Sequence, residues 1–313
     1  MSSLHNLRPL VLVLALFAAA PMSLGRPAGN LETAEFATVK ATIDAQVAEF
    51  GASNVLVVFD IDNTTLATDL DIGSEHWFMW QSQLVTAGDR AGGAVATTVA
   101  DLLKVQGWIL TVTPMHAVEP QIPSNLTELG QQGVRFMSLT SRMLDVRDVT
   151  LRELERLAFP YATTAPGPVG GFGGAYKPYD SSNPEAYGLT AADVERFGLT
   201  VPKDVIFERG VMLTQGQHKG SMLKTILAKT GAKFDAIVFV DDRVHHLQGV
   251  QAAFETRDEA VTTVRYVHEQ GRIAAFNATD KADVKAQWCA FSNGLAAFYR
   301  HDASIKTPFL TCE

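Results

Sequence analysis

Cysteine is scarce in this 313-residue sequence, which contains only Cys289 and Cys312. Neither residue belongs to a Cys-x-x-Cys pair or stands at metal-ligand spacing from a histidine, which argues against the usual zinc and dithiol redox motifs. In an exported protein these two cysteines can form a disulfide, which would tie the C-terminal tail to the helix that carries Cys289. Two free or separately buried thiols are the alternative.

Basic residues are also few. The sequence has 26 Lys and Arg against 34 Asp and Glu, which gives a net charge of −8. No basic stripe is present that could neutralise a phosphate backbone, and this argues against a nucleic-acid partner. The acidic balance still allows small anionic substrates, because a bound metal ion can reverse the local field of an acidic site.

Long apolar runs are missing after the N-terminus, so no later segment is predicted to cross a membrane. The N-terminal run has the three parts of a secretory signal: Arg8 is a basic start, 10–20 is apolar, and 23–25 is a small-x-small cleavage site. We therefore predict a signal peptide over 1–25, a mature chain that begins near Arg26, a periplasmic or secreted location, and no membrane contact after cleavage. A retained N-terminal anchor is the alternative.

Internal repeats and a phosphate-binding loop are also absent from the sequence. The Gly- and Pro-rich segment 160–184 has no Gly-Lys-Ser/Thr ending, so we interpret it as an excursion from the fold within 160–203. If this excursion folds over a binding site, Tyr176 and Tyr179 are candidate contacts.

The most informative stretch that is present is 55–66, Val-Leu-Val-Val-Phe-Asp-Ile-Asp-Asn-Thr-Thr-Leu. Its first five residues form an unbroken apolar run, which predicts a strand buried on both faces of a parallel sheet. Asp60 and Asp62 stand where that strand should end. Because open α/β sheets bind ligands at the carboxyl ends of strands, these two carboxylates are candidate site residues.

Strand-like and helix-like segments alternate along the rest of the sequence. This order predicts an α/β fold, a Rossmann-like parallel sheet of about five strands flanked by helices. The gaps after Asp60 and after Thr140 are longer than one crossover helix needs. We therefore expect one domain, 26–313, with a mainly helical cap insertion within 66–130 and the Gly/Pro-rich insertion within 160–203. The expected strands are 55–59, 134–140, 204–207, 236–240 and 261–267.

Three later element ends also carry chemically useful side chains. They are a hydroxyl pair that closes the second predicted strand, a lysine near a helix start, and an acidic pair after another apolar strand. Each feature alone is common as a cap or a solvated surface group. Together with the acids after the first strand, in this order on alternating strands and helices, the set is specific. The residues are Thr140, Ser141, Lys219, Asp241 and Asp242.

This set resembles the four signature motifs of the haloacid dehalogenase (HAD) superfamily of phosphatases. The segment Val57-Val-Phe-Asp-Ile-Asp-Asn-Thr-Thr-Leu66 matches the first motif throughout. Thr140 matches the second motif, Lys219 the third, and the acidic pair at 241–242 the fourth. The resemblance covers most of 50–270. It is closer still to an uncharacterised bacterial HAD-like group with the Leu-Thr-Ser-Arg and Val-Asp-Asp elements, which does not name a substrate.

The resemblance implies, and phosphoryl-transfer chemistry supports, a phosphomonoesterase that acts on a small phosphorylated substrate. Asp60 would be the nucleophile that forms an aspartyl-phosphate. Asp62, two residues later, would point to the same side of the strand, protonate the leaving oxygen and later activate water. The remaining phosphate oxygens would be held by Thr140, Ser141 and Lys219.

The same chemistry predicts a metal cofactor. Two carboxylates and a phosphate dianion repel one another, so the site needs a divalent cation held by hard oxygen ligands. We expect Mg²⁺, bound by Asp60, by Asp62 through its main-chain carbonyl, and by Asp241 or Asp242.

Other interpretations of the first motif are weaker. A calcium loop of the EF-hand type would need Gly and Glu at the positions where the sequence has Thr65 and Asp71. Dehalogenases of the superfamily lack the second acid, so Asp62 favours hydrolysis of a phosphate ester. A phosphotransferase, or a catalytically weak exported binding protein on a HAD scaffold, stays open. No oligomeric state is predicted.

Several residues beside the motifs have structural interpretations. Arg142 and Arg243 each follow a motif, and each is predicted to pair with a site carboxylate rather than reach substrate. His245 and His246 would point about 100° apart on a helix, so we expect one to be buried and one exposed. The aromatic cluster 76–80 is predicted to be a packing face, with pocket lining as the alternative.

Overall fold

The computed structural model describes residues 30–299, 309–310 and 312. The predicted signal peptide, 1–25, lies outside the described residues. Within the part of the chain that is described, no helix is both long and apolar enough to span a bilayer.

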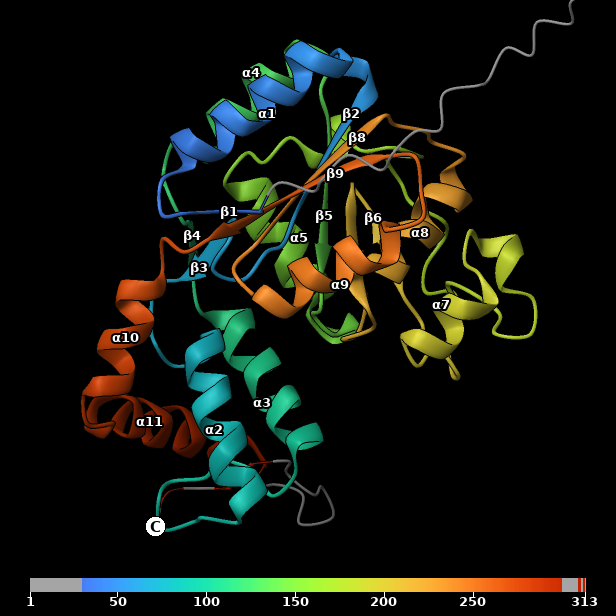
Figure 1. Ribbon diagram of the computed structural model, residues 1–313. Coiled ribbons are helices and arrows are strands. Elements are labelled where there is room, and N and C mark those ends of the chain that lie inside the picture. Colours follow the sequence, from blue (N-terminus) through green and yellow to red (C-terminus); the bar gives the residue numbers. More distant parts are fainter. Residues whose placement is uncertain (1–29, 300–308, 311, 313) are drawn as a thin grey trace, which may run out of the picture.

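The fold is α/β, as predicted, and its main sheet has seven strands rather than about five. Neighbouring strands are parallel except for the last pair, which is antiparallel. The strand that precedes Asp60, β2, lies in the middle of the sheet (Figure 1). In spatial order the strands are β1 (Asn30–Thr33), β9 (Ala260–Tyr266), β8 (Ala236–Asp241), β2 (Val55–Phe59), β5 (Arg135–Thr140), β7 (Val211–Leu213) and β6 (Ile206–Glu208).

Two strands account for the difference in number. β1 is a four-residue edge strand, Asn-Leu-Glu-Thr, and has no apolar run that could identify it. β7 is the parallel neighbour of β5, whereas the strand expected at 204–207 corresponds to β6, the antiparallel edge strand. The turn between them is Arg209-Gly210, and both residues have positive φ. A two-residue turn of this kind matches the twist of a hairpin.

The strand β2 is buried on both faces, as its apolar run predicts. Val55, Val57 and Phe59 belong to one hydrophobic core, while Leu56 and Val58 belong to another on the opposite face. The first face is covered by α1 (Phe36–Phe50), α4 (Ile122–Gln131) and α5 (Arg147–Arg156), and the second by α8 (Lys219–Thr230) and α9 (Val244–Phe254). Short 3-10 helices η1 (Ala52–Asn54) and η2 (Leu144–Val146) precede β2 and α5.

A third hydrophobic cluster lies beside the sheet and is built mainly from helices, with further residues from the loops around α2 and from the C-terminal tail. It joins two helices from the expected 66–130 insertion to two C-terminal helices, as Figure 1 shows below the sheet. The helical content expected in that range is therefore present, but the sequence did not predict its C-terminal partners. The helices are α2 (Glu75–Ala87), α3 (Val99–Val112), α10 (Gln270–Ala278) and α11 (Ala282–Tyr299), while β3 (Leu66–Thr68) and β4 (Met115–Ala117), which flank α2 and α3 in the chain, contribute to the first core instead. The strands β3 and β4 pair with each other in a small antiparallel sheet.

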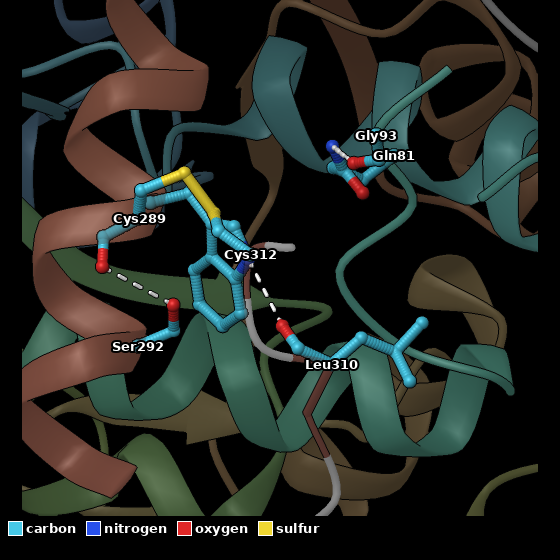
Figure 2. The surroundings of a disulfide bond; sticks show 7 residues. Gln81, Gly93, Cys289, Ser292, Leu310 and Cys312 are labelled. Carbon is cyan, nitrogen blue, oxygen red and sulfur yellow. Dashed lines mark hydrogen bonds between the residues drawn. A yellow bond between two sulfur atoms is a disulfide. The ribbon is translucent and has the colours of Figure 1, made fainter. Parts of the chain in front are cut away.

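A disulfide joins Cys289 of α11 to Cys312, with the two Cα atoms 5.3 Å apart, so the first of the two alternatives that the sequence left open is the one in the structure. In Figure 2 Leu310 lies near this bond, and its carbonyl accepts a hydrogen bond from the indole of Trp288 at 3.2 Å. Both contacts hold these C-terminal residues against the helical cluster.

The Gly- and Pro-rich excursion packs beside α8. Tyr176 and Tyr179 belong to the core on that face of the sheet, and the backbone of Tyr176 bridges to Val205. An ion pair of 2.9 Å between Asp193 and Lys224 attaches the excursion to α8. The two tyrosines are therefore packing residues and do not contact the candidate site. The excursion contains α6 (Tyr161–Thr164), the 3-10 helix η3 (Pro184–Tyr187) and α7 (Ala191–Arg196).

Candidate active site

The sheet brings the first, second and fourth motifs to one edge. The register pairs Phe59 with Val240, and the amide of Asp60 donates to the carbonyl of Val240 at 2.9 Å, which sets Asp60 beside Asp241. On the other side β2 runs parallel to β5, which ends at Thr140. Parallel strands present their carboxyl ends together, so these side chains meet although they are distant in sequence.

Lys219 joins the third motif to the first and the fourth. Its ammonium lies 2.7 Å from Asp60 Oδ1 and 2.7 Å from Asp241 Oδ2. The side chain is only 1% exposed, because Lys219 is the first residue of α8 and projects from the helix start towards the strand ends. Burial opposes its charge, but the two facing carboxylates raise the pKa of Lys219 above its usual value. Lys219 is thus a buried cation whose counterions are both motif acids.

Asp60 is almost fully buried at the tip of β2. Burial raises the pKa of its carboxyl group to about 6; Lys219 acts in the opposite direction, and the nearby charges of Asp241 and Asp62 add to the rise. The main-chain carbonyl of Asp60 accepts a hydrogen bond from the hydroxyl of Thr65 at 3.0 Å, which fixes the turn after the strand. A small rise in local positive charge would therefore ionise this carboxyl group fully at neutral pH.

Asp62 is held by a two-point ion pair with Arg142, as predicted for that arginine. The Nε atom of Arg142 lies 3.0 Å from Asp62 Oδ2, and a terminal guanidinium nitrogen lies 2.9 Å from Oδ1. Arg142 is buried and also donates to the hydroxyl of Thr150 at 2.8 Å. Burial disfavours the charge on Asp62, but Arg142 outweighs it and lowers the pKa of Asp62. Asp62 is therefore held as a carboxylate.

The two hydroxyl residues of the second motif occupy different positions. Thr140 is buried, its Oγ1 accepts a hydrogen bond from the amide of Arg142 at 3.2 Å, and its carbonyl accepts two from Thr214 at 2.9 Å. Ser141 is half-buried and lines a pocket together with Asp62. Thr140 is thus rigidly placed at the strand end, while Ser141 faces accessible space.

Asp242 has an unsatisfied carboxylate oxygen. Its Oδ1 is buried and has no hydrogen-bond partner among the described residues, while its Oδ2 lies 3.5 Å from Nε of Arg243. Burial raises the pKa of Asp242 to about 9, and the charges of Glu75, Asp241 and Asp60 add to the rise. By contrast Asp241 has three partners: Lys219, the amide of Arg243 at 2.8 Å, and His246. Of the two acids, Asp242 is therefore the one with an unpaired carboxylate oxygen that can bind a ligand.

Glu75 is a site residue that the sequence did not reveal. It lies at the start of α2, where it accepts a hydrogen bond from Nε of Arg243 at 2.9 Å and another from the side-chain amide of Asn63. Burial raises its pKa to about 7; Arg243 opposes this rise, and Asp62 adds to it. An acid in the first turn of a helix is common for electrostatic reasons, so its sequence position alone carried no functional signal. Arg243 pairs with this carboxylate and lies near Asp242, as predicted.

The charges of the site favour a bound divalent cation. Five carboxylates and three Lys or Arg side chains lie within it, so two negative charges stay uncompensated when all are ionised. The raised pKa values of Asp60, Glu75 and Asp242 have this crowding as one of their causes. Carboxylate oxygens are the ligands that Mg²⁺ prefers, and the free oxygen of Asp242 is placed to serve as one. The donor set therefore fits a hard divalent cation.

One histidine joins this set. His246 lies with Nδ1 3.1 Å from Asp241 Oδ2, and potential ligand atoms of Asp60, Asp241 and His246 lie within 4.8 Å of one another. His245 is exposed, as predicted for one member of the pair, but His246 is half-buried rather than buried. However, the ammonium of Lys219 already contacts both acids of that trio, so Asp242 is the more available ligand.

A pocket of about 160 Å³ opens beside Asp62. It lies between the second motif and the helices α2 and α3 of the helical cluster, so both parts of the molecule contribute to the site. Residues of 160–203 are absent from its lining. The lining residues are Asp62, Glu75, Phe78, Leu103, Gln106, Gly107, Leu110, Ser141, Arg142, Met143, Asp145 and Val146.

The fold and the site together define a class of α/β proteins. In this class a cluster of buried carboxylates lies at the carboxyl ends of parallel strands, and a lysine bridges two of the carboxylates. The chain belongs to the family described as "Protein of unknown function (DUF2608)", whose model matches residues 32–298. A search of curated proteins found no significant match.

Proposed function

We propose that this protein is a Mg²⁺-dependent phosphomonoesterase of the HAD type that acts on a small phosphorylated substrate. One observation carries the proposal: Lys219 lies 2.7 Å from both Asp60 and Asp241, which are the tips of two adjacent parallel strands. This contact supports the proposal because it joins the candidate nucleophile and the acidic pair of the fourth motif to one buried cation, and phosphoryl transfer needs a nucleophile, a phosphate-binding cation and an acidic metal site close together.

In the proposed reaction Asp60 attacks phosphorus through Oδ2, the oxygen that does not face Lys219, and an aspartyl-phosphate forms as the ester bond breaks. Lys219 and the Thr140 hydroxyl hold the transferred phosphoryl oxygens. Water then attacks phosphorus, and phosphate leaves Asp60. Mg²⁺ would neutralise charge on the phosphoryl group, and the residues suited to hold it are Asp60, Asp242 and the main-chain carbonyl of Asp62.

In this scheme Asp62 donates a proton in the first step and accepts one in the second, and its ion pair with Arg142 affects the two steps differently. The Arg142 ion pair favours the carboxylate, so Asp62 is ready to accept a proton from water in the second step. Proton donation to a leaving alkoxide requires a protonated Asp62, which the same ion pair disfavours. We therefore infer that leaving groups which depart without a proton, such as phenolates, react faster than alkoxides.

We also propose that the protein is exported to the periplasm or outside the cell. It is supported by the signal-like N-terminus and by the disulfide, which is a feature of oxidising compartments.

The test is hydrolysis of p-nitrophenyl phosphate by purified protein with Mg²⁺, with a chelator, and with the variant Asp60→Asn. We expect turnover that needs both Mg²⁺ and Asp60. The variant Asp148→Asn is the matched control, because its side chain is 90% exposed and lies outside the site. Absence of Mg²⁺-dependent turnover above the Asp60→Asn level on a broad phosphoester panel would overturn the proposal.

A second candidate has one observation in its favour. The Asp62–Arg142 pair occupies the carboxylate that hydrolysis would use, as expected for a binding protein on the same scaffold. That protein would bind Mg²⁺ and inorganic phosphate but give no turnover. A phosphotransferase would instead transfer the phosphoryl group to an added alcohol, which product analysis distinguishes.

A further inference from the structure

A second cavity lies in the helical cluster, away from the strand ends. Its volume is about 630 Å³, and its lining shares no residue with the pocket beside Asp62. Small-molecule sites commonly have volumes of roughly 300–1,000 Å³. The cavity is bounded by α2, the loop that follows it, α11 and residues near the disulfide; Figure 2 shows Gln81, Gly93 and Leu310 around this region.

Three tryptophans line this cavity: Trp77, Trp80 and Trp288. Trp77 and Trp288 are buried, and Trp80 is half-buried. Two of them come from the aromatic cluster 76–80, so that cluster provides both a packing face and a pocket wall. Flat aromatic walls favour a planar apolar ligand, because rings stack on them with large contact area.

The charged residues that line the cavity are basic. Arg90 and Lys285 belong to the lining, and none of the described Asp or Glu residues does, although the whole chain has a net charge of −8. Among the described residues, neither cation has an ion-pair or side-chain hydrogen-bond partner. A β-carbon added at Gly93 would lie 2.9 Å from Cε of Lys285, so this lysine packs on the loop that also carries Arg90.

One buried donor of the wall is unsatisfied. The indole N–H of Trp77 is buried without a hydrogen-bond partner in the described part of the chain, whereas Trp288 donates to Leu310. The amide of Gln81 is already occupied: it donates to the carbonyl of Gly93 at 3.1 Å and accepts from the amide of Val95 at 3.0 Å. A buried donor without a partner is unfavourable, so a ligand acceptor beside Trp77 would be stabilised.

We propose that this cavity binds a small planar aromatic anion, with its ring against Trp80, the most accessible of the three tryptophans, and its acidic group at Arg90 and Lys285. The inference is independent of the phosphatase proposal, because no residue of the strand-end cluster takes part.

Tryptophan fluorescence gives a direct readout, because three of the four tryptophans of the chain line the cavity. The probe is 1-anilinonaphthalene-8-sulfonate, and its uncharged analogue N-phenyl-1-naphthylamine is the matched control ligand. We expect saturable quenching by the sulfonate with one site per chain, weaker binding of the neutral analogue, and loss of sulfonate affinity as NaCl rises from about 0.05 to about 0.5 M.

Two variants test the two halves of the site. The double variant Arg90→Gln with Lys285→Gln should weaken sulfonate binding about three- to tenfold and leave the neutral analogue unchanged, since exposed charges contribute modestly. Lys233→Gln, an exposed lysine outside the cavity, is the charge-matched control and should have no effect. Ala91→Phe, at the exposed rim, should weaken both ligands by filling space.

Each variant is first checked by circular dichroism for an unchanged fold. The proposal is wrong if the native protein shows no saturable quenching, if the neutral analogue binds as tightly as the sulfonate, or if the double variant binds the sulfonate with native affinity.

Discussion

Arg142 donates two hydrogen bonds to Asp62, at 3.0 and 2.9 Å, and so joins the acid of the first motif to the residue that directly follows the second. The guanidinium is buried, and Thr150 of α5 accepts a third hydrogen bond from it. The pair therefore has a fixed geometry, and it connects the ends of two neighbouring strands through side chains.

Loss of Arg142 should destabilise the protein at neutral pH. Arg142→Met leaves Asp62 without its partner, and because that carboxylate is about one-third exposed we expect a loss of about 2–3 kcal/mol rather than the full value for a buried pair. Asp62 has a lowered pKa in the fold, so its contribution is present above the unfolded pKa and disappears as pH falls below about 4. Urea unfolding at pH 7 and pH 3 should show the difference between native protein and variant shrinking in acid. An equal difference at both values would contradict this.

The same pair should control leaving-group preference. If Asp62 is a poor proton donor while paired, aryl phosphates should be hydrolysed faster than alkyl phosphates. Arg142→Lys keeps the positive charge but loses the two-point geometry, which raises the proton affinity of Asp62. The variant should therefore have a smaller aryl-to-alkyl ratio of kcat/KM. A ratio identical to that of the native protein would show that Asp62 does not supply the proton.

Without Mg²⁺ three carboxyl groups of the site should each lower the stability of the protein as pH rises from about 4 to about 9. Asp60, Glu75 and Asp242 have folded pKa values raised to about 6, 7 and 9, so the folded state binds more protons than the unfolded state across this range. Their contribution is complete below the unfolded pKa and falls as pH rises through the folded values. Mg²⁺ should restore stability most at alkaline pH.

Thermal unfolding in chelator and in Mg²⁺ at pH 5, 7 and 9 measures this effect. Asp242→Asn serves as the matched variant, because it removes the carboxylate with the highest of the three values and should flatten the metal-free pH dependence. A metal-free protein that gains stability between pH 5 and 9 would contradict the charge balance described for the site.

Glu75 and Arg243 should be energetically coupled. Their side chains are 24% and 31% exposed, so we expect a coupling energy of about 1 kcal/mol in a double-mutant cycle of Glu75→Gln and Arg243→Gln. Unfolding in urea gives the energies, and kcat/KM for the same four proteins tests whether the contact also positions α2 over the site. Additive effects on both quantities would show that the contact is incidental.

The disulfide should stabilise the helical cluster more than the sheet. Its cysteines are 23 residues apart, for which a cross-link commonly contributes about 2–4 kcal/mol. Replacement of both cysteines by serine should speed hydrogen exchange in α11 and leave β2 protected, because the helical cluster has its own core. Uniformly faster exchange in both elements would instead indicate one cooperative unit.

The central strands were predictable because their apolar runs are continuous. Residues 55–59 and 236–240 are apolar without interruption, and burial on both faces is what makes such runs necessary. β1 could not be predicted, because an edge strand has one free side and tolerates Asn, Glu and Thr. β7 has only three residues, too few to show a period.

The residues of the candidate site also fall into two groups, those that the sequence predicts and those that it does not. Asp60, Asp241 and Lys219 stand at element ends, where chain order and topology predict that they meet. Glu75 could not be predicted, because its position depends on how α2 packs across the strand ends, which is a tertiary contact without a local signal. The partnership of α2 and α3 with α10 and α11 has the same cause: it depends on which apolar faces find each other in space.

The pairing of β2 with β8 has a consequence for how the protein reaches its active form. Val55 lies opposite Ala236, so the two strands that carry Asp60 and Asp241 are separated by more than half of the chain. Contacts of such long sequence separation form late and slow the folding reaction. We therefore expect that a partly folded chain contains no metal site, so that metal loading follows completion of the sheet and acquisition of activity reports the last step of assembly.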